Sequence, residues 1–214
     1  MFKYLFVLIY IVFIFLISII SKKINPDNKE TTRKIIHIGI GPLIPFAKYL
    51  EIDQNTALFF TGIASIMIIL NYQYKVLATI EDVDRKSFGT LFYCLSLLIL
   101  ITLFWTEDPI SLIAGFFVMT FGDGLAGLIG KNFKSKSWFF LEQKKSLYGT
   151  LTMFFTSLIV ITSLGYFNDY KLSINFFTIA SIATLLEQFS IYGIDNFIVP
   201  IFTAICFNLL FTSI

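Results

Sequence analysis

Charged residues are scarce in this sequence. Lys, Arg, Asp and Glu make up 14% of its 214 residues, whereas a soluble domain carries about 25%. Hydrophobic residues make up 57%, including 26 phenylalanines, and the mean hydropathy is +0.81. This composition excludes an ordinary soluble domain and predicts a helical protein that crosses the membrane several times.

Cysteine and histidine are almost absent, which excludes several kinds of site. Cys94 and Cys206 both lie inside apolar runs, so neither a disulfide framework nor a C-x-x-C site is predicted. His37 is the single histidine. It has no cysteine partner for a zinc centre and no nucleophile elbow for a serine hydrolase.

The sequence also lacks the usual nucleotide-binding loops. No segment matches the P-loop pattern G-x-x-x-x-G-K-[ST]. Gly122, Gly124 and Gly127 fit G-x-G-x-x-G, but no strand–helix–strand pattern surrounds them, so a dinucleotide site is not predicted. Any nucleotide site must therefore be built in another way.

What the chain does contain is a series of long apolar segments. They cover residues 2–20, 35–50, 56–70, 88–105, 109–129, 147–167, 174–191 and 197–214. We predict an all-α, polytopic transmembrane bundle of seven or eight spans, forming a single domain over residues 1–214. Segment 35–50 contains two glycines and two prolines, so we expect it to be kinked or re-entrant.

Basic residues alternate between successive connections. The connections after the first, third and fifth segments hold 13 of the 16 Lys and Arg residues, and the other connections with the N-terminus hold 3. Because basic loops stay in the cytoplasm, the odd-numbered connections are predicted to be cytoplasmic. The N-terminus is then outside.

Polar clusters fall on this same predicted cytoplasmic side. They are Arg33-Lys34 with His37, Arg85-Lys86, Gly122-Asp123-Gly124, Lys144-Lys145-Ser146, Glu187, and Asp195-Asn196. Nucleotides are cytoplasmic, so the convergence of these groups on one face favours a nucleotide site there.

Acidic residues inside apolar segments are the strongest functional candidates. An acid within the bilayer costs roughly 2.5–3.5 kcal/mol and is functional by default. Asp123, Glu187 and Asp195 offer carboxylates that can hold Mg²⁺ while substrate phosphates complete its coordination. The lysines and arginines would offset phosphate charge, which is the main requirement of phosphoryl transfer.

Several of these residues also have purely structural interpretations. Arg33, Lys34 and Arg85 are what the positive-inside rule places at loop ends. His37 can serve as a hydrogen-bonding residue between packed helices. Small residues such as Ala126 and Gly130, four apart on a helix, let a neighbouring helix approach closely.

Five short motifs resemble those of a known family, the CTP-dependent polyprenol and lipid kinases. They are RKIIH (33–37), RKSFGTLFY (85–93), GDGLAGLIGK (122–131), KKSLYGT (144–150) and ATLLEQFSIYGIDNFIVP (183–200). They occur in the family's order, and their wording is most similar to that of phytol kinases.

The resemblance implies transfer of the CTP γ-phosphate to the hydroxyl of a long isoprenoid alcohol. For phytol the product is phytyl phosphate, which is used towards tocopherol and related prenyl lipids. The expected partners are the lipid alcohol, CTP, Mg²⁺ and the bilayer, with no nucleic acid; the sequence predicts no oligomeric state.

Asp123, Lys145 and His37 are the expected catalytic residues. Metal ligands would be Asp123, Glu187 and Asp195, and phosphate or nucleotide ligands would be Arg33, Lys34, Arg85, Gly122, Gly124, Lys144, Ser146 and Asn196.

One departure from the family and several alternatives accompany this interpretation. The family often has an acid where this chain has Tyr148. The motifs serve phosphoryl chemistry in general, so dolichol, undecaprenol, farnesol or diacylglycerol are alternative acceptors. A phosphatidate cytidylyltransferase is a further alternative, although its longer acidic signature is missing. A non-enzymatic transporter would use Asp123 and Glu187 as coupling acids.

Overall fold

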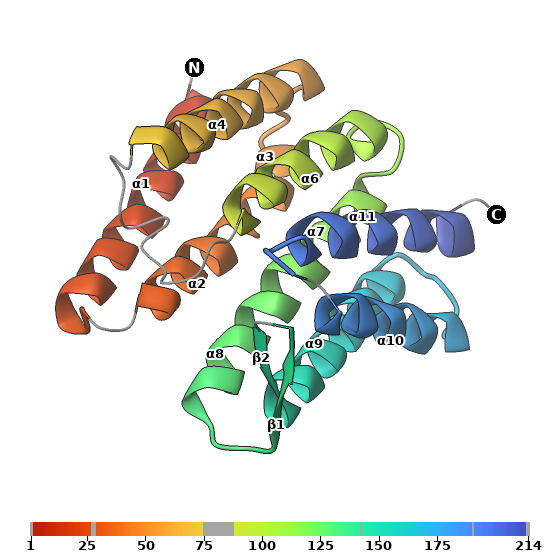
Figure 1. Cartoon of the computed structure of the whole chain (residues 1–214). Coiled ribbons are helices and arrows are strands. Elements are labelled where there is room, and N and C mark those ends of the chain that lie inside the picture. The colour runs from red at the N-terminus through yellow and green to blue at the C-terminus, as the bar shows by residue number, and fades with distance from the viewer. Residues whose placement is uncertain (1, 27–28, 75–87, 142, 190, 213–214) are drawn as a thin grey trace.

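The protein is a bundle of helices with one small β-hairpin (Figure 1). The computed structural model describes residues 2–26, 29–74, 88–141, 143–189 and 191–212. The helices are α1 (Phe2–Ile24), α2 (Lys29–Ile40), α3 (Leu43–Tyr49), α4 (Gln54–Tyr74), α6 (Gly89–Phe104), α7 (Pro109–Phe117), α8 (Gly124–Asn132), α9 (Leu147–Phe167), α10 (Ile174–Gln188) and α11 (Asp195–Phe207). Two π-helical turns, η1 (Val118–Asp123) and η2 (Asn208–Thr212), and two strands, β1 (Ser137–Phe140) and β2 (Gln143–Ser146), complete the described elements.

The predicted all-α class is confirmed, and so is the kink predicted in segment 35–50. That segment divides into α2 and α3 at Gly41 and Pro42. Proline has no N–H to continue the helical hydrogen bonds, and the Gly41 N–H instead donates to the carbonyl of Ile38 at 3.2 Å. The predicted segment 147–167 coincides with α9.

Length and apolar composition make this a membrane protein. Four helices are long and apolar enough to cross a bilayer: Phe2–Ile24, Gln54–Tyr74, Pro109–Asn132 and Leu147–Phe167. The apolar helices Gly89–Phe104 and Asp195–Phe211 are shorter. Large apolar side chains on α1, such as Leu8 and Phe13, are more than half exposed. A row of this kind is stable in lipid but would be an aggregation hazard in water.

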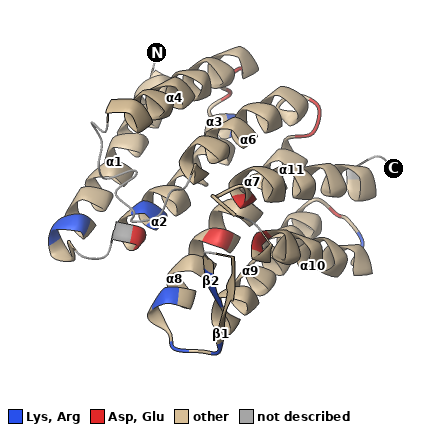
Figure 2. Ribbon diagram, in the orientation of Figure 1, with Lys and Arg blue, Asp and Glu red and all other residues tan. Residues whose placement is uncertain are grey.

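Successive passes of the chain run in alternate directions between two ends of the bundle. At one end, Lys3 Nζ donates to the Glu51 carbonyl (2.8 Å), so the start of α1 meets the end of α3. At the same end, Gln54 Nε2 donates to the Ile101 carbonyl (2.8 Å), joining the start of α4 to the last turn of α6. We call the opposite end, where α1 finishes with Lys22 and Lys23, the basic end. Figure 2 shows Lys and Arg gathered towards it, in the lower part of the view.

The continuous helical path from α7 through η1 to α8 forms the centre of the core. Leu112, Phe116 and Met119 on this path have no exposed surface. Helix α11 packs against α7 at Gly115, where a Cβ atom would collide with the Pro200 carbonyl oxygen and lie 2.8 Å from Ala204 Cβ. Because Gly115 has no side chain, α7 and α11 can pack this closely.

This contact leads to a prediction about stability. Gly115→Ala should lower the free energy of unfolding by about 1–3 kcal/mol, the usual cost of overpacking a filled core. Gly62→Ala on α4 is the matched control, since a Cβ there meets nothing within 4 Å and alanine is the better helix former. Thermal unfolding of both purified variants in one detergent measures the difference. Equal melting temperatures would contradict the close α7–α11 contact.

Candidate active site

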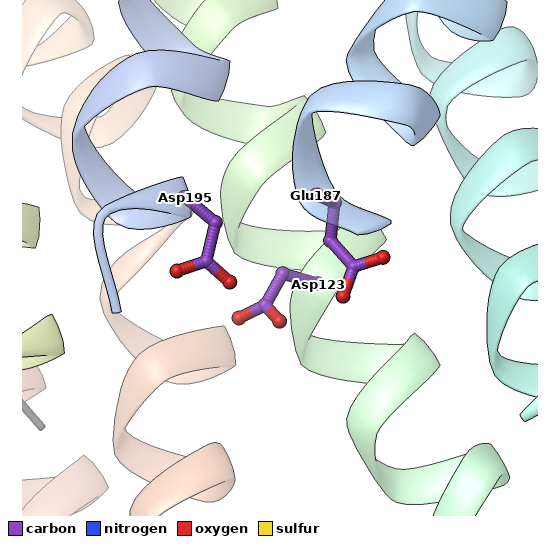
Figure 3. A group of neighbouring side chains, drawn as sticks. All are labelled: Asp123, Glu187 and Asp195. Atoms are coloured by element: carbon purple, nitrogen blue, oxygen red, sulfur yellow. The ribbon is translucent and has the colours of Figure 1, made fainter. Parts of the chain in front are cut away.

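Three buried acids meet near the basic end of the bundle (Figure 3). Asp123 is the last residue of η1, Glu187 lies in the last turn of α10, and Asp195 is the first residue of α11. One carboxylate oxygen from each lies within 4.8 Å of the other two, and all three residues are less than 9% exposed. The convergence of these acids, predicted from sequence, is confirmed.

The local structure around Asp123 explains how so many elements reach it. A π-helical turn, which widens the backbone ring and is frequent at functional sites, ends at this residue. A Cβ on Gly122 would lie 2.7 Å from Met153 Sδ on α9, and one on Gly124 would collide with Ile38 on α2. These two glycines therefore let α9 and α2 pack beside the acid. Their phosphate-binding role stays a prediction.

Two buried lysines pair with two of the acids. Lys34 Nζ lies 2.5 Å from Asp123 Oδ2 and donates to the Asp123 carbonyl at 3.1 Å. Lys145 Nζ binds the Glu187 carboxylate and donates to the Glu187 carbonyl at 2.8 Å. Both lysines are less than 9% exposed. Buried charges persist only when they are paired in this way.

His37 lies next to the Lys34–Asp123 pair, because it follows Lys34 by about one turn on the same helix, α2. Its Nε2 atom is 3.5 Å from Asp123 Oδ2 and 3.3 Å from the Met119 carbonyl oxygen. The Tyr93 ring stacks at a tilt, 4.5 Å from the imidazole centroid. Tyr93 also donates to the His37 carbonyl at 3.2 Å. Sequence reasoning missed Tyr93, because a tyrosine inside an apolar segment carries no signal that it supports a histidine.

Other predicted basic residues make their side-chain contacts elsewhere or are exposed. Arg33 shares a helix with His37 but pairs with Glu30 one turn earlier, at 2.7 Å. Lys144 is exposed, because residues alternate between the two faces of a strand and Lys145 takes the inward position. Arg85 lies outside the described residues. The structure thus brings Lys34 and Lys145 to the acids, and it does not bring Arg33 or Lys144 into contact with them.

Ser146 and Tyr148 have positions that sequence did not predict. The Ser146 hydroxyl accepts a hydrogen bond from the Gly149 N–H at 3.2 Å and so caps α9. This capping bond gives the serine a structural role, while its phosphate-binding role stays a prediction. The side chain of Tyr148, where relatives often have an acid, is 46% exposed. The three buried acids therefore assemble without any contribution from this position.

Two amides complete the surroundings of the acids. Asn196 Nδ2 donates to the Gly193 carbonyl at 3.1 Å, and within the described residues its buried Oδ1 has no hydrogen-bond partner. Gln188 Nε2 donates to Glu187 Oε2 at 2.7 Å. Glu187 is therefore held on one oxygen by Lys145 and on the other by Gln188. Asn196 was a predicted ligand, whereas Gln188 was missed because a glutamine at the end of an apolar segment usually faces solvent.

Comparison with known proteins identifies the family. The chain is 35% identical over 187 residues to the phytol kinase of Synechocystis sp., an alignment covering 86% of this chain and 80% of that protein. The chain belongs to the phytol kinase family. It is also 28% identical over 212 residues to phytol kinase 1, chloroplastic, of Arabidopsis thaliana, covering 88% of this chain and 69% of that one. No family model and no solved structure matches. The family predicted from the five motifs is confirmed.

The charges and the donor atoms of the site suit a divalent cation such as Mg²⁺. Three carboxylates face two ammonium groups, which leaves one net negative charge among these five buried side chains. Around an octahedral Mg²⁺, opposite oxygens lie about 4.2 Å apart and adjacent oxygens about 3 Å apart, so the three carboxylate oxygens, which lie within 4.8 Å of one another, would move closer together to hold the ion. Asn196 Oδ1, which has no hydrogen-bond partner among the residues that the structure describes, is a further oxygen of the type that Mg²⁺ accepts. The donor set therefore fits this ion.

Proposed function

We propose that this protein transfers the γ-phosphoryl group of CTP to the hydroxyl of a long isoprenoid alcohol, phytol in the first instance. The observation that supports this most is the set of three buried acids facing two buried lysines, in a chain of the phytol kinase family. Phosphoryl transfer depends mainly on positioning and on charge stabilisation. The site supplies fixed charges of both signs within a few ångströms.

Each charged group has a role in this proposal. Asp123, Glu187 and Asp195 would hold Mg²⁺, which would neutralise the negative charge of the phosphate groups. The ammonium groups of Lys34 and Lys145, besides pairing with the acids, would donate hydrogen bonds to the β- and γ-phosphates. Their burial strengthens this attraction, because the surroundings screen charge less than water does.

The acceptor hydroxyl would lie beside Asp123 and His37. Its oxygen forms the new bond to the γ-phosphorus while the bond from that phosphorus to the CDP oxygen breaks. The alcohol proton passes to the Asp123 carboxylate or to His37, whose Nε2 lies 3.5 Å away from that carboxylate. Gln188 keeps Glu187 from rotating during the transfer, since it donates to the oxygen that Lys145 leaves free.

The membrane arrangement is part of the proposal. We propose eight crossings, formed by α1, α2 with α3, α4, α6, α7 to α8, α9, α10 and α11, with the N-terminus outside. The alternating direction of these passes and the gathering of Lys and Arg at the basic end support it. The site then lies on the cytoplasmic face. The hydrocarbon tail of the alcohol would lie between helices, in contact with lipid.

Labelling of lipids in sealed vesicles of known orientation tests this function. CTP labelled in its γ-phosphate is added outside the vesicles with phytol, farnesol, dolichol or diacylglycerol. We expect labelled phytyl phosphate only when the basic end faces outward, and we expect EDTA to abolish it and added Mg²⁺ to restore it. ATP replaces CTP in a parallel series.

Each other outcome has a definite meaning. Label transferred to a different alcohol would change the acceptor but keep the kinase. Incorporation from α-labelled CTP alone would indicate a cytidylyltransferase. No labelled lipid with any alcohol and nucleotide would exclude the proposed activity.

A further inference from the structure

The β-hairpin presents two different faces, and only one of them is turned towards the acids. Strands β1 and β2 pair antiparallel with Trp138 opposite Lys145 and Phe139 opposite Lys144. Directly opposed residues project from the same face of a sheet. Since Lys145 reaches Glu187, Trp138 lies on the inward face. Phe139, 72% exposed, lies on the outward face together with Lys144.

The inward face is held against the end of α10. Phe140 lies two residues after Trp138 and on the same face, and its ring packs edge-on against Phe189 at 5.2 Å. Phe189 follows Glu187 by two residues. At the base of the hairpin, the Leu147 N–H donates to the Lys136 carbonyl at 2.8 Å. The hairpin is thus fixed at both ends beside the site.

Trp138 itself is left partly uncovered between these two anchors. It is 39% exposed, and within the described residues no other ring packs on its indole. In the same part of the chain, the groups that meet at the acids are charged side chains, amides and the imidazole of His37, which, like the Tyr93 ring packed on it, is less than 9% exposed. They can bind phosphates and a cation, but they offer no surface for the base of a nucleotide. Trp138 is an aromatic surface directly across the strand pair from a lysine of the site.

We propose that Trp138 stacks on the base of the nucleotide whose phosphates meet Lys145 and the acids. This inference rests on the proposed nucleotide-dependent function and adds the residue that holds the base. Stacking on an aromatic side chain suits any base, because every base has a π-face. Trp138 therefore contributes affinity for nucleoside triphosphates in general and does not itself select CTP over ATP.

The test uses the purified full-length protein in lipid nanodiscs and measures both kinetics and binding. Trp138→Ala should raise KM for CTP roughly 5- to 150-fold with kcat within about threefold of the original. Trp138→Tyr should restore most of the affinity. Phe139→Ala, the neighbouring aromatic on the outward face, should leave KM for CTP unchanged.

Intrinsic fluorescence gives a second measurement that needs no catalysis. The chain has two tryptophans, and Trp105 is 2% exposed, with its indole N–H bonded to the Ile52 carbonyl at 3.2 Å. CTP with Mg²⁺ and no alcohol should quench emission in the original protein and in Phe139→Ala, but not in Trp138→Tyr or Trp138→Ala. Quenching in a protein that phosphorylates no lipid would leave this inference standing while the proposed function fails.

The inference is overturned if an active Trp138→Ala variant keeps both its KM for CTP and its emission response. It is also overturned if the substitution changes KM for phytol and not that for CTP, because Trp138 would then belong to the membrane interface, where tryptophan is common. Should Trp138→Ala fail to fold, Trp138→Leu is measured in its place against the same two criteria.

Discussion

Asp123→Asn is expected to lower kcat for phosphoryl transfer roughly 100- to 1,000-fold, the range seen when one fixed electrostatic group is removed from an active site. Asparagine preserves the shape of the side chain but removes the negative charge that lies within 4.8 Å of two other acids. It also removes the strongest partner of Lys34 and the carboxylate nearest His37. Initial rates with saturating phytol and CTP measure the effect.

A folding defect must be separated from this loss of activity. Removing one partner of a buried ion pair costs about 3–5 kcal/mol, because the other charge is left uncompensated. The double variant Lys34→Met with Asp123→Asn removes both charges of the pair. We expect it to unfold at a temperature closer to that of the original protein while staying inactive. Recovery of activity in the double variant would show that Asp123 serves stability alone.

Asp53→Asn is the matched control for this substitution. Asp53 is an exposed carboxylate at the opposite end of the bundle, beside the start of α4. Hydrogen bonds from the hydroxyl and N–H of Thr56 hold the pKa of Asp53 below its ordinary value, so it is charged at neutral pH. It therefore matches Asp123 in charge without belonging to the site, and we expect normal kinetics. Equal losses from both variants would contradict a specific role for Asp123.

Lys145→Met should give the second-largest effect, a fall in kcat/KM for CTP of roughly 100-fold or more, as expected when a buried charged partner is lost. Lys145 holds one oxygen of Glu187 and is the lysine of the hairpin that faces the acids. Methionine keeps the length of the aliphatic chain and removes the charge. The loss should be accompanied by a lower unfolding temperature. Of the two side chains that bind the Glu187 carboxylate, Lys145 and Gln188, only Gln188 would then remain.

Lys144→Met provides the control one residue away on the same strand. Lys144 is exposed on the outward face, opposite Phe139. The same chemical change there should alter kcat/KM by less than about threefold, in keeping with the small effects of surface charges. A large loss from Lys144→Met, with little from Lys145→Met, would mean that the hairpin turns its other face to the nucleotide.

Much of this architecture follows from hydropathy and from the cost of burying charge. Apolar segments give the helices, and the glycine and proline of segment 35–50 give the break between α2 and α3. Acids inside apolar segments are so unfavourable that the positions of Asp123 and Glu187 in the sequence already mark them as functional candidates. Together with Asp195 they do converge.

The pairing of particular side chains could not be predicted in the same way. The two basic residues in RK or in KK look equally suited to bind an acid, and only the turn of a helix or the alternation of a strand decides which one faces inward. All four were predicted to belong to the site, and only the structure shows that Lys34 and Lys145, rather than Arg33 and Lys144, contact the acids. The hairpin was missed because its strands are four residues long and mix aromatic, basic and small side chains without a clear alternation.

The two lysine–acid pairs also set an order for assembly during synthesis. Lys34 and Asp123 are 89 residues apart, and Lys145 and Glu187 are 42 apart. The first pair is complete once α8 has been inserted, but Lys145 must wait for α9 and α10 to follow. A chain that stops before α10 therefore leaves the Lys145 ammonium without its acid partner, which is a strongly unfavourable state for a buried charge. The contact between the hairpin and the acids therefore forms only after α10 has been added to the bundle.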